Sequence, residues 1–211
     1  MALNAPEYPV QFSVEYPDRP LNRLSSFFRL IAVIPIGIVV VVVSGGQFGV
    51  SGAGTSLGMV AVIGGFVSAP GLMIFYRRKY PRWWFDWLLA LLRFENRVAA
   101  FLLLMRDEYP STDEEQSVHL EIPYPDVETD LNRWLLLVKW ILAIPHYIVL
   151  FFLGVGVFVA VIVSWFAILF TGRYPRRLFE FVEGWLRWTN RVNAYAFILV
   201  TDRYPPFRLS S

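Results

Sequence analysis

The 211-residue sequence contains no cysteine, and this absence narrows the chemistry that the protein can perform. Without thiols, a disulfide bond, a thiolate nucleophile, an iron-sulfur cluster and a zinc-thiolate site are all excluded. Histidine is scarce too, with only His119 and His146 in the chain, whereas a metal site needs several histidine or carboxylate ligands. We therefore expect no cofactor and no metal.

Acidic residues are missing from the longest apolar segments. No Asp or Glu lies between Leu24 and Tyr76 or between Trp134 and Thr171. Ion-coupled transporters use acidic side chains within the membrane, so a coupled transporter is disfavoured. His146 lies within the second of these segments and is a candidate intramembrane polar site. It either forms local hydrogen bonds after Pro145 or contacts a ligand such as a quinone.

Apolar residues are what the chain has in abundance. They make up 56% of the sequence, and the mean hydropathy is +0.48, which is typical of an integral membrane protein rather than a soluble domain. Basic clusters such as Arg77-Arg78-Lys79 follow the apolar segments, while the Gly-rich loop 44–58 carries no charge. By the positive-inside rule, both termini are expected on the cytoplasmic side.

Several motifs occur twice at a nearly constant spacing. Tyr80 and Tyr174 are 94 positions apart, as are Asn96 and Asn190, and Tyr109 and Tyr204 are 95 apart. The N-terminal parts of the copies match at a larger spacing, because the Gly-rich loop is an insertion in the first copy. The chain is therefore predicted to be a tandem duplication, with a first repeat over residues 1–110, a linker over 111–117 and a second repeat over 118–211.

Each repeat is predicted to contain a strand, a two-helix transmembrane hairpin, an interfacial amphipathic helix and a second strand. The transmembrane helices are expected at about 24–43, 59–76, 134–153 and 157–171, the interfacial helices at about 82–97 and 176–191, and the strands at about 8–16, 98–105, 118–122 and 194–201. The second hairpin is expected to turn near Gly154 and Gly156. The predicted fold is thus an α-helical integral membrane protein with four transmembrane helices, a small cytoplasmic sheet formed by the four strands, and a pseudo-two-fold axis along the membrane normal.

Both interfacial segments carry a stripe of polar or small residues under an aromatic surface, which suits the headgroup boundary of a membrane. The stripe arginines are candidate contacts for lipid headgroups, since basic residues beside a cytoplasmic leaflet gain about 1 kcal/mol each. These residues are Arg82, Arg93, Arg97, Arg176, Arg187 and Arg191.

Arg29 and Lys139 occupy matching positions inside the first helix of each hairpin. One interpretation is that both side chains extend to the headgroups. The alternative is that Arg29 pairs with Asp86 and Lys139 with Glu180, which would fasten each interfacial helix to its own hairpin.

The order strand, Leu-Asn-Arg, apolar hairpin, Arg-Tyr-Pro-Arg, Asn-Arg-Val, strand and Asp-x-Tyr-Pro resembles a prokaryotic membrane family known as domain of unknown function 4389. The similarity is most specific over 172–206 and at Ile144-Pro145-His146. The resemblance implies the cytoplasmic (inner) membrane of a prokaryote as the location, and it implies no activity.

The sequence favours a non-catalytic membrane protein that is structural or contacts lipids, and that forms an oligomer or serves as an accessory subunit of a membrane assembly. One alternative is a small channel or carrier with its pathway on the pseudo-two-fold axis. Another is a lipid-modifying membrane enzyme that would use either His146 or the stripe carboxylates Asp86 and Glu180. Membrane lipids are the expected partners, and nucleic acid is not.

Overall fold

The computed structural model describes residues 8–29, 34–35, 71, 73–112, 114, 116–127, 131–136 and 138–210. Residues 23–29 and 73–77 are helical. Most of the predicted first hairpin, with its helices at 24–43 and 59–76 and the Gly-rich loop, lies outside the described residues.

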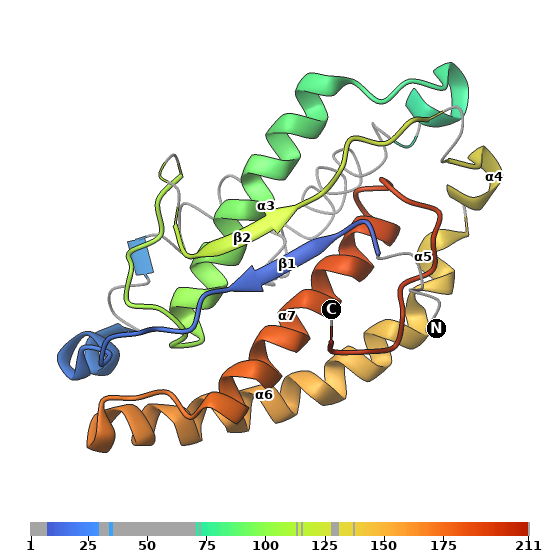
Figure 1. Cartoon of the computed structure of the whole chain (residues 1–211). Coiled ribbons are helices and arrows are strands. Elements are labelled where there is room, and N and C mark those ends of the chain that lie inside the picture. The colour runs from blue at the N-terminus through green and yellow to red at the C-terminus, as the bar shows by residue number, and fades with distance from the viewer. Residues whose placement is uncertain are drawn as a thin grey trace, which may run out of the picture.

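Two short strands form an antiparallel pair, β1 over Gln11–Val14 and β2 over Val118–Glu121 (Figure 1). Phe12 lies opposite Leu120, and Val14 opposite Val118. These four side chains are buried, while Ser13 and His119 on the other face are exposed. The alternation of apolar and polar residues therefore located both strands correctly.

The strands predicted at 98–105 and 194–201 are wrong. The first segment begins inside helix α3, which runs over Arg82–Leu102, and the second begins inside α7, which runs over Arg176–Ala196. Each helix starts directly after a proline in extended conformation, Pro81 or Pro175, which fits the preference of proline for helix starts. The apolar run after Asn-Arg-Val is buried because it continues the helix, so the predicted four-stranded sheet is a two-stranded one in the described residues.

The helices cover the sheet in a crossed arrangement. α3 packs against β2, and α7 packs against β1. Arg93 of α3 donates from Nε to the Leu120 carbonyl at 3.0 Å, and Arg187 of α7 donates from Nε to the Phe12 carbonyl at 2.9 Å. A strand from one half of the chain is therefore fixed to a helix from the other half.

The predicted turn near Gly154 and Gly156 is also wrong. After two short helices, α4 over Arg133–Leu136 and α5 over Lys139–Leu142, helix α6 runs without interruption over Ile144–Thr171. A Cβ at Gly154 would lie 3.6 Å from Trp185, and one at Gly156 3.4 Å from Phe181, both on α7. Both distances are ordinary contacts, so the two glycines lie where α6 packs on α7 and not in a turn.

Helix α6 is the part of the described structure that meets the length and hydropathy of a membrane-crossing helix. It lies beside α7, to which it is joined by the turn at Gly172, as Figure 1 shows in orange and red. The number of times the whole chain crosses the membrane stays a prediction, because most of residues 30–70 lie outside the described part.

Candidate functional site

Two buried cations, Arg29 and Lys139, form ion pairs with residues that follow α3 and α7. Arg29 is 2% exposed, forms an ion pair with Asp107 and donates to the Phe101 carbonyl at 3.0 Å. Lys139 is fully buried, lies 2.7 Å from Asp202 and donates to the Thr201 carbonyl at 2.8 Å. Each pair thus fastens the segment that follows the strand to the segment that follows α3 or α7.

The predicted pairs Arg29 with Asp86 and Lys139 with Glu180 are therefore wrong, although the cations do form ion pairs. Asp86 is exposed, and Glu180 pairs on its own helix with Arg176 at 3.3 Å. The actual partners belong to the repeated Asp-x-Tyr-Pro motif. Because α3 and α7 are longer than predicted, the motif that follows each helix lies beside Arg29 or Lys139. A buried cation of this kind requires an acidic partner.

Asp107 and Asp202 also bind backbone amides at the start of the apolar segments. Asp107 accepts from the Asn22 amide at 2.6 Å, and Asp202 accepts from the Asn132 amide at 2.5 Å. The side chains of Asn22 and Asn132 in turn accept, each at 3.0 Å, from the amides two residues later. The repeated Leu-Asn motif and the Asp-x-Tyr-Pro motif are thus parts of one junction, which occurs twice.

Four of the six stripe arginines donate hydrogen bonds to backbone carbonyls of the protein. Besides Arg93 and Arg187, Arg97 donates to the Ser111 carbonyl at 2.7 Å and Arg191 donates to the Ser210 carbonyl at 2.9 Å. Burial and the neighbouring arginines lower the pKa of Arg191 to about 10. These side chains cross-link backbone segments by donating to carbonyl oxygens, and Arg93 does so from an exposed position.

Among the stripe arginines, Arg82, Arg93 and Arg176 are exposed, and the guanidinium groups of Arg82 and Arg176 lie over tyrosine rings. The guanidinium of Arg82 lies 5.3 Å from the ring centre of Tyr124, and that of Arg176 lies 5.7 Å from Tyr16. Each therefore stands beside a Tyr-Pro turn that comes from the other half of the chain, and remains accessible to an anion.

His146 lies on α6 in a fully buried aromatic environment. Trp188 donates from Nε1 to its Nδ1 at 3.1 Å, and the ring of Phe207 stacks on the imidazole at 4.0 Å. Because Nδ1 accepts, the proton of the neutral ring is on Nε2, which has no hydrogen-bond partner among the described residues. This arrangement favours the local, structural interpretation of His146 over a ligand contact.

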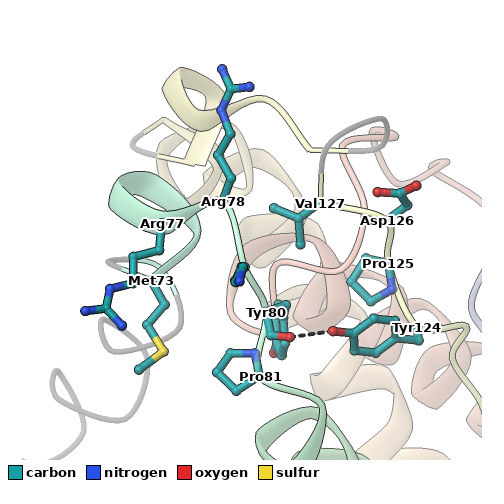
Figure 2. A pocket seen from close by; sticks show the side chains of 10 residues that line it. Met73, Arg77, Arg78, Tyr80, Pro81, Tyr124, Pro125, Asp126 and Val127 are labelled. Carbon is teal, nitrogen blue, oxygen red and sulfur yellow. Dashed lines mark hydrogen bonds between the residues drawn. The ribbon is translucent and has the colours of Figure 1, made fainter.

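Two grooves lie where the Tyr-Pro turns meet. We call them the Tyr80 groove and the Tyr174 groove. Their walls include the pairs Tyr80-Pro81 with Tyr124-Pro125, and Tyr174 with Tyr16-Pro17, and their volumes are about 720 and 320 Å³. The Tyr124 hydroxyl donates to the Tyr80 carbonyl, as Figure 2 shows, and the Tyr16 hydroxyl donates to the Tyr174 carbonyl at 2.5 Å.

The two grooves differ in charge. Arg77, Arg78 and Lys79 line the Tyr80 groove, together with Asp126, and all three cations are exposed. Thr171, Gly172 and Arg173 occupy the corresponding positions in the second half, 94 residues later. The difference in charge between the two grooves is therefore visible in the sequence once the motifs are aligned at this spacing.

No group of three or more His, Asp or Glu side chains in the described residues could hold a metal ion. The described part of the chain is thus mainly helical, with a small two-stranded sheet and one helix long and apolar enough to cross a membrane. Residues 133–208 match the model of a family described as Domain of unknown function (DUF4389). The family resemblance seen in the sequence is confirmed over this region. Comparison with curated proteins and with solved structures gave no match.

Proposed function

We propose that this protein is a non-catalytic membrane protein, built as a tandem duplication, that forms a structural platform in contact with lipids on the cytoplasmic face of a prokaryotic inner membrane. The observation that carries this proposal is the outer face of α6, where large apolar side chains follow one another at helical spacing. The exposed ones are Ile144, Ile148, Phe151, Phe152, Val155, Phe158, Val159, Ile162, Val163, Phe166 and Phe170.

The opposite face of α6 is covered by α7, and this contact bears on orientation. The helices run antiparallel, since Trp188 contacts His146 and Trp185 donates from Nε1 to the Leu150 carbonyl at 3.1 Å. If α6 lay along the membrane normal, α7 would enter the hydrocarbon core with it. α7 carries Arg176 and Glu180, whose side chains are 77% and 62% exposed, and each charge in the core costs about 3 kcal/mol.

We therefore propose that α6 lies in the plane of the membrane surface, with its outer face among the acyl chains and α7 and the sheet on the aqueous side. This orientation explains why α6 is apolar on all sides, because one side meets lipid and the other meets the protein core. It also returns both ends of α6 to the cytoplasmic side, as the predicted hairpin would have done. The predicted crossing of the membrane by the first hairpin is a separate proposal, which does not depend on the orientation of α6.

Paired contacts support the tandem duplication. Arg29 and Lys139 bind equivalent aspartates, and their charged groups lie 4.5 Å from the ring of Phe101 and 5.3 Å from that of Tyr195. The two rings are 94 residues apart. Because these contacts recur at the spacing of the motifs, a duplicated unit with a pseudo-two-fold axis along the membrane normal accounts for them.

The alternative functions gain less support. His146 and Ser164, which a channel or carrier could use as polar lining, are both fully buried against the protein. Asp86 and Glu180, which a lipid-modifying enzyme could use, are exposed and lie apart from the buried His146. A structural and lipid-contacting role, with self-association or a partner subunit, therefore remains the proposal.

The absence of cysteine makes a direct test practical, because a single introduced cysteine is the only thiol in the chain. Cysteine at Glu180 should react with a membrane-impermeant maleimide in inside-out vesicles but not in intact cells. Cysteine at Phe158, which is 67% exposed in the protein, should react in neither until detergent is added. Rapid labelling of the Phe158 variant in sealed vesicles would contradict insertion of the outer face of α6.

A further inference from the structure

We propose that the Tyr80 groove binds the phosphate of an anionic phospholipid headgroup; this site rests on the membrane-surface role proposed above. The groove lies directly after helix 73–77, where the chain leaves the predicted first hairpin. Three consecutive exposed cations, Arg77, Arg78 and Lys79, line it. Consecutive basic residues beside a membrane segment are the side chains that anionic headgroups attract.

The backbone at Arg78 gives a second reason. Arg78 has a φ of +48°, and its amide donates to the Ile74 carbonyl at 3.1 Å to end the helix. Gly172 fills the matching position with a φ of +73° and the matching bond to Ile168. Glycine adopts this left-handed conformation without the steric penalty that arginine incurs. A positive charge is thus retained at residue 78 at a conformational cost, which points to a use for that charge.

The surroundings favour a lipid over free phosphate. Met73 is 41% exposed and lines the same groove, and Tyr76 on the same short helix is 77% exposed. Figure 2 shows Met73 beside Arg77, so an apolar wall adjoins the cationic one. A headgroup phosphate could meet the cations while the attached chains follow Met73 and Tyr76. Free phosphate would make no use of this apolar surface.

Asp126 stands on the side of the groove away from Arg77 in Figure 2. A carboxylate at this end disfavours a second anionic group there, so a headgroup with one phosphodiester fits better than one with several phosphates. The Tyr174 groove provides an internal comparison. It is lined by Asp18, Arg19 and Arg173, and in the sequence Gly172 takes the position that Arg78 has in the first half.

The test compares two variants of the full chain, purified in neutral detergent, that lose the same amount of charge. R77T/R78G gives the Tyr80 groove the residues of the second half, and R19Q/R173Q removes two cations from the Tyr174 groove. Native mass spectrometry would measure binding of dioleoylphosphatidylglycerol, with dioleoylphosphatidylcholine as the uncharged reference. We expect R77T/R78G to weaken phosphatidylglycerol binding about tenfold or more, as the loss of two headgroup contacts implies, and R19Q/R173Q to change it less than about twofold.

Thermal unfolding supplies the folding control, since R78G alone relieves the left-handed arginine and should not lower the unfolding midpoint. Equal loss of binding in both double variants would overturn the proposal, because attraction would then follow net charge alone. Displacement of the lipid by millimolar inorganic phosphate would also overturn it, by showing a site for free phosphate. Alkaline extraction of the wild type separates the two proposals. A protein released from membranes contradicts the membrane-surface role, whereas a retained protein with unchanged lipid binding in R77T/R78G contradicts only the groove.

Discussion

Asn96 and Asn190 bind each other across the interface between α3 and α7. The Asn96 Nδ2 donates to Asn190 Oδ1 at 2.9 Å, and the Asn190 Nδ2 donates to Asn96 Oδ1 at 2.7 Å. Both side chains are at least 94% buried, with exposures of 6% and 5%. The two residues are 94 positions apart in the sequence, which is the spacing of the paired motifs, and their contact is the one that the proposed duplication would place beside its two-fold axis.

Replacing one of these asparagines should be costly. N96L leaves the Asn190 amide with an unsatisfied buried group, and we expect a loss of about 1–3 kcal/mol in the free energy of unfolding. The double variant N96L/N190L removes both amides and should recover part of that loss. Denaturant unfolding in detergent provides the measurement. Additive losses in the double-mutant cycle would show that the two side chains do not interact.

The buried ion pairs should matter more than the exposed one. K139M leaves Asp202 without its cation in a site where Lys139 is fully buried, so we expect a loss of about 3 kcal/mol. R176Q breaks the exposed pair with Glu180 and should cost less than about 1 kcal/mol. Thermal unfolding of the two variants under one set of conditions compares them. Similar unfolding midpoints for both would contradict the role of Asp202 as an anchor.

Two glycines should respond in opposite ways to alanine. A Cβ at Gly184 on α7 would lie 2.8 Å from the Leu209 Cβ and 3.0 Å from its carbonyl oxygen, so G184A must displace the C-terminal segment and should cost about 1–3 kcal/mol. A Cβ at Gly154 would meet Trp185 at 3.6 Å, an ordinary contact. G154A should therefore be neutral or stabilising by up to about 1 kcal/mol. Unfolding midpoints that rank the variants in the reverse order would refute this packing.

Acid should weaken the contact between Glu108 and Ser117. Burial alone would raise the pKa of Glu108, but hydrogen bonds from Ser117 and Arg106 outweigh it and lower the pKa below the ordinary value. A carboxyl group with a lowered folded-state pKa stabilises the fold above its unfolded-state pKa, and this stability is lost as the pH falls through the folded-state pKa.

Stability measured from pH 6 down to pH 3 should therefore decline, and S117A should make the decline shallower. S13A, on the exposed face of β1, is the control and should leave the pH dependence unchanged. A wild-type curve that is flat over this range, or one that S117A does not alter, would contradict the assignment.

The sequence predicted the parts of the fold whose signals are local. Alternation of apolar and polar residues located β1 and β2, and Pro81 and Pro175 marked the starts of α3 and α7. The ends of these helices were missed, because residues 98–105 and 194–200 are apolar throughout. A short buried run of that kind has no period that separates helix from strand. The helices end at Leu102 and Ala196. Leu104 and Leu199, which follow shortly after, have a positive φ that their sequence does not predict.

The contacts between segments that are distant in the chain were the hardest part of the structure to predict from the sequence. The positions of Arg29 and Lys139 indicated that each needs a partner, but several carboxylates could have served, and the length of α3 and α7 decided in favour of Asp107 and Asp202. Arg187 seemed available for lipid because the stripe was considered on its helix alone. Its carbonyl partner on β1 becomes visible only when the halves of the chain are placed together.

The orientation of α6 is the central claim, and a depth profile tests it most directly. Single spin-labelled cysteines would replace Ile148, Val155 and Phe166, which are 54%, 53% and 50% exposed along the outer face. In reconstituted vesicles, oxygen and a polar nickel complex report the immersion depth of each label. We expect all three depths to agree within a few ångströms, at the boundary of headgroups and acyl chains. Since each residue advances about 1.5 Å along a helix, a spanning α6 would place Val155 about 10 Å deeper than Ile148, and that result would contradict the in-plane account.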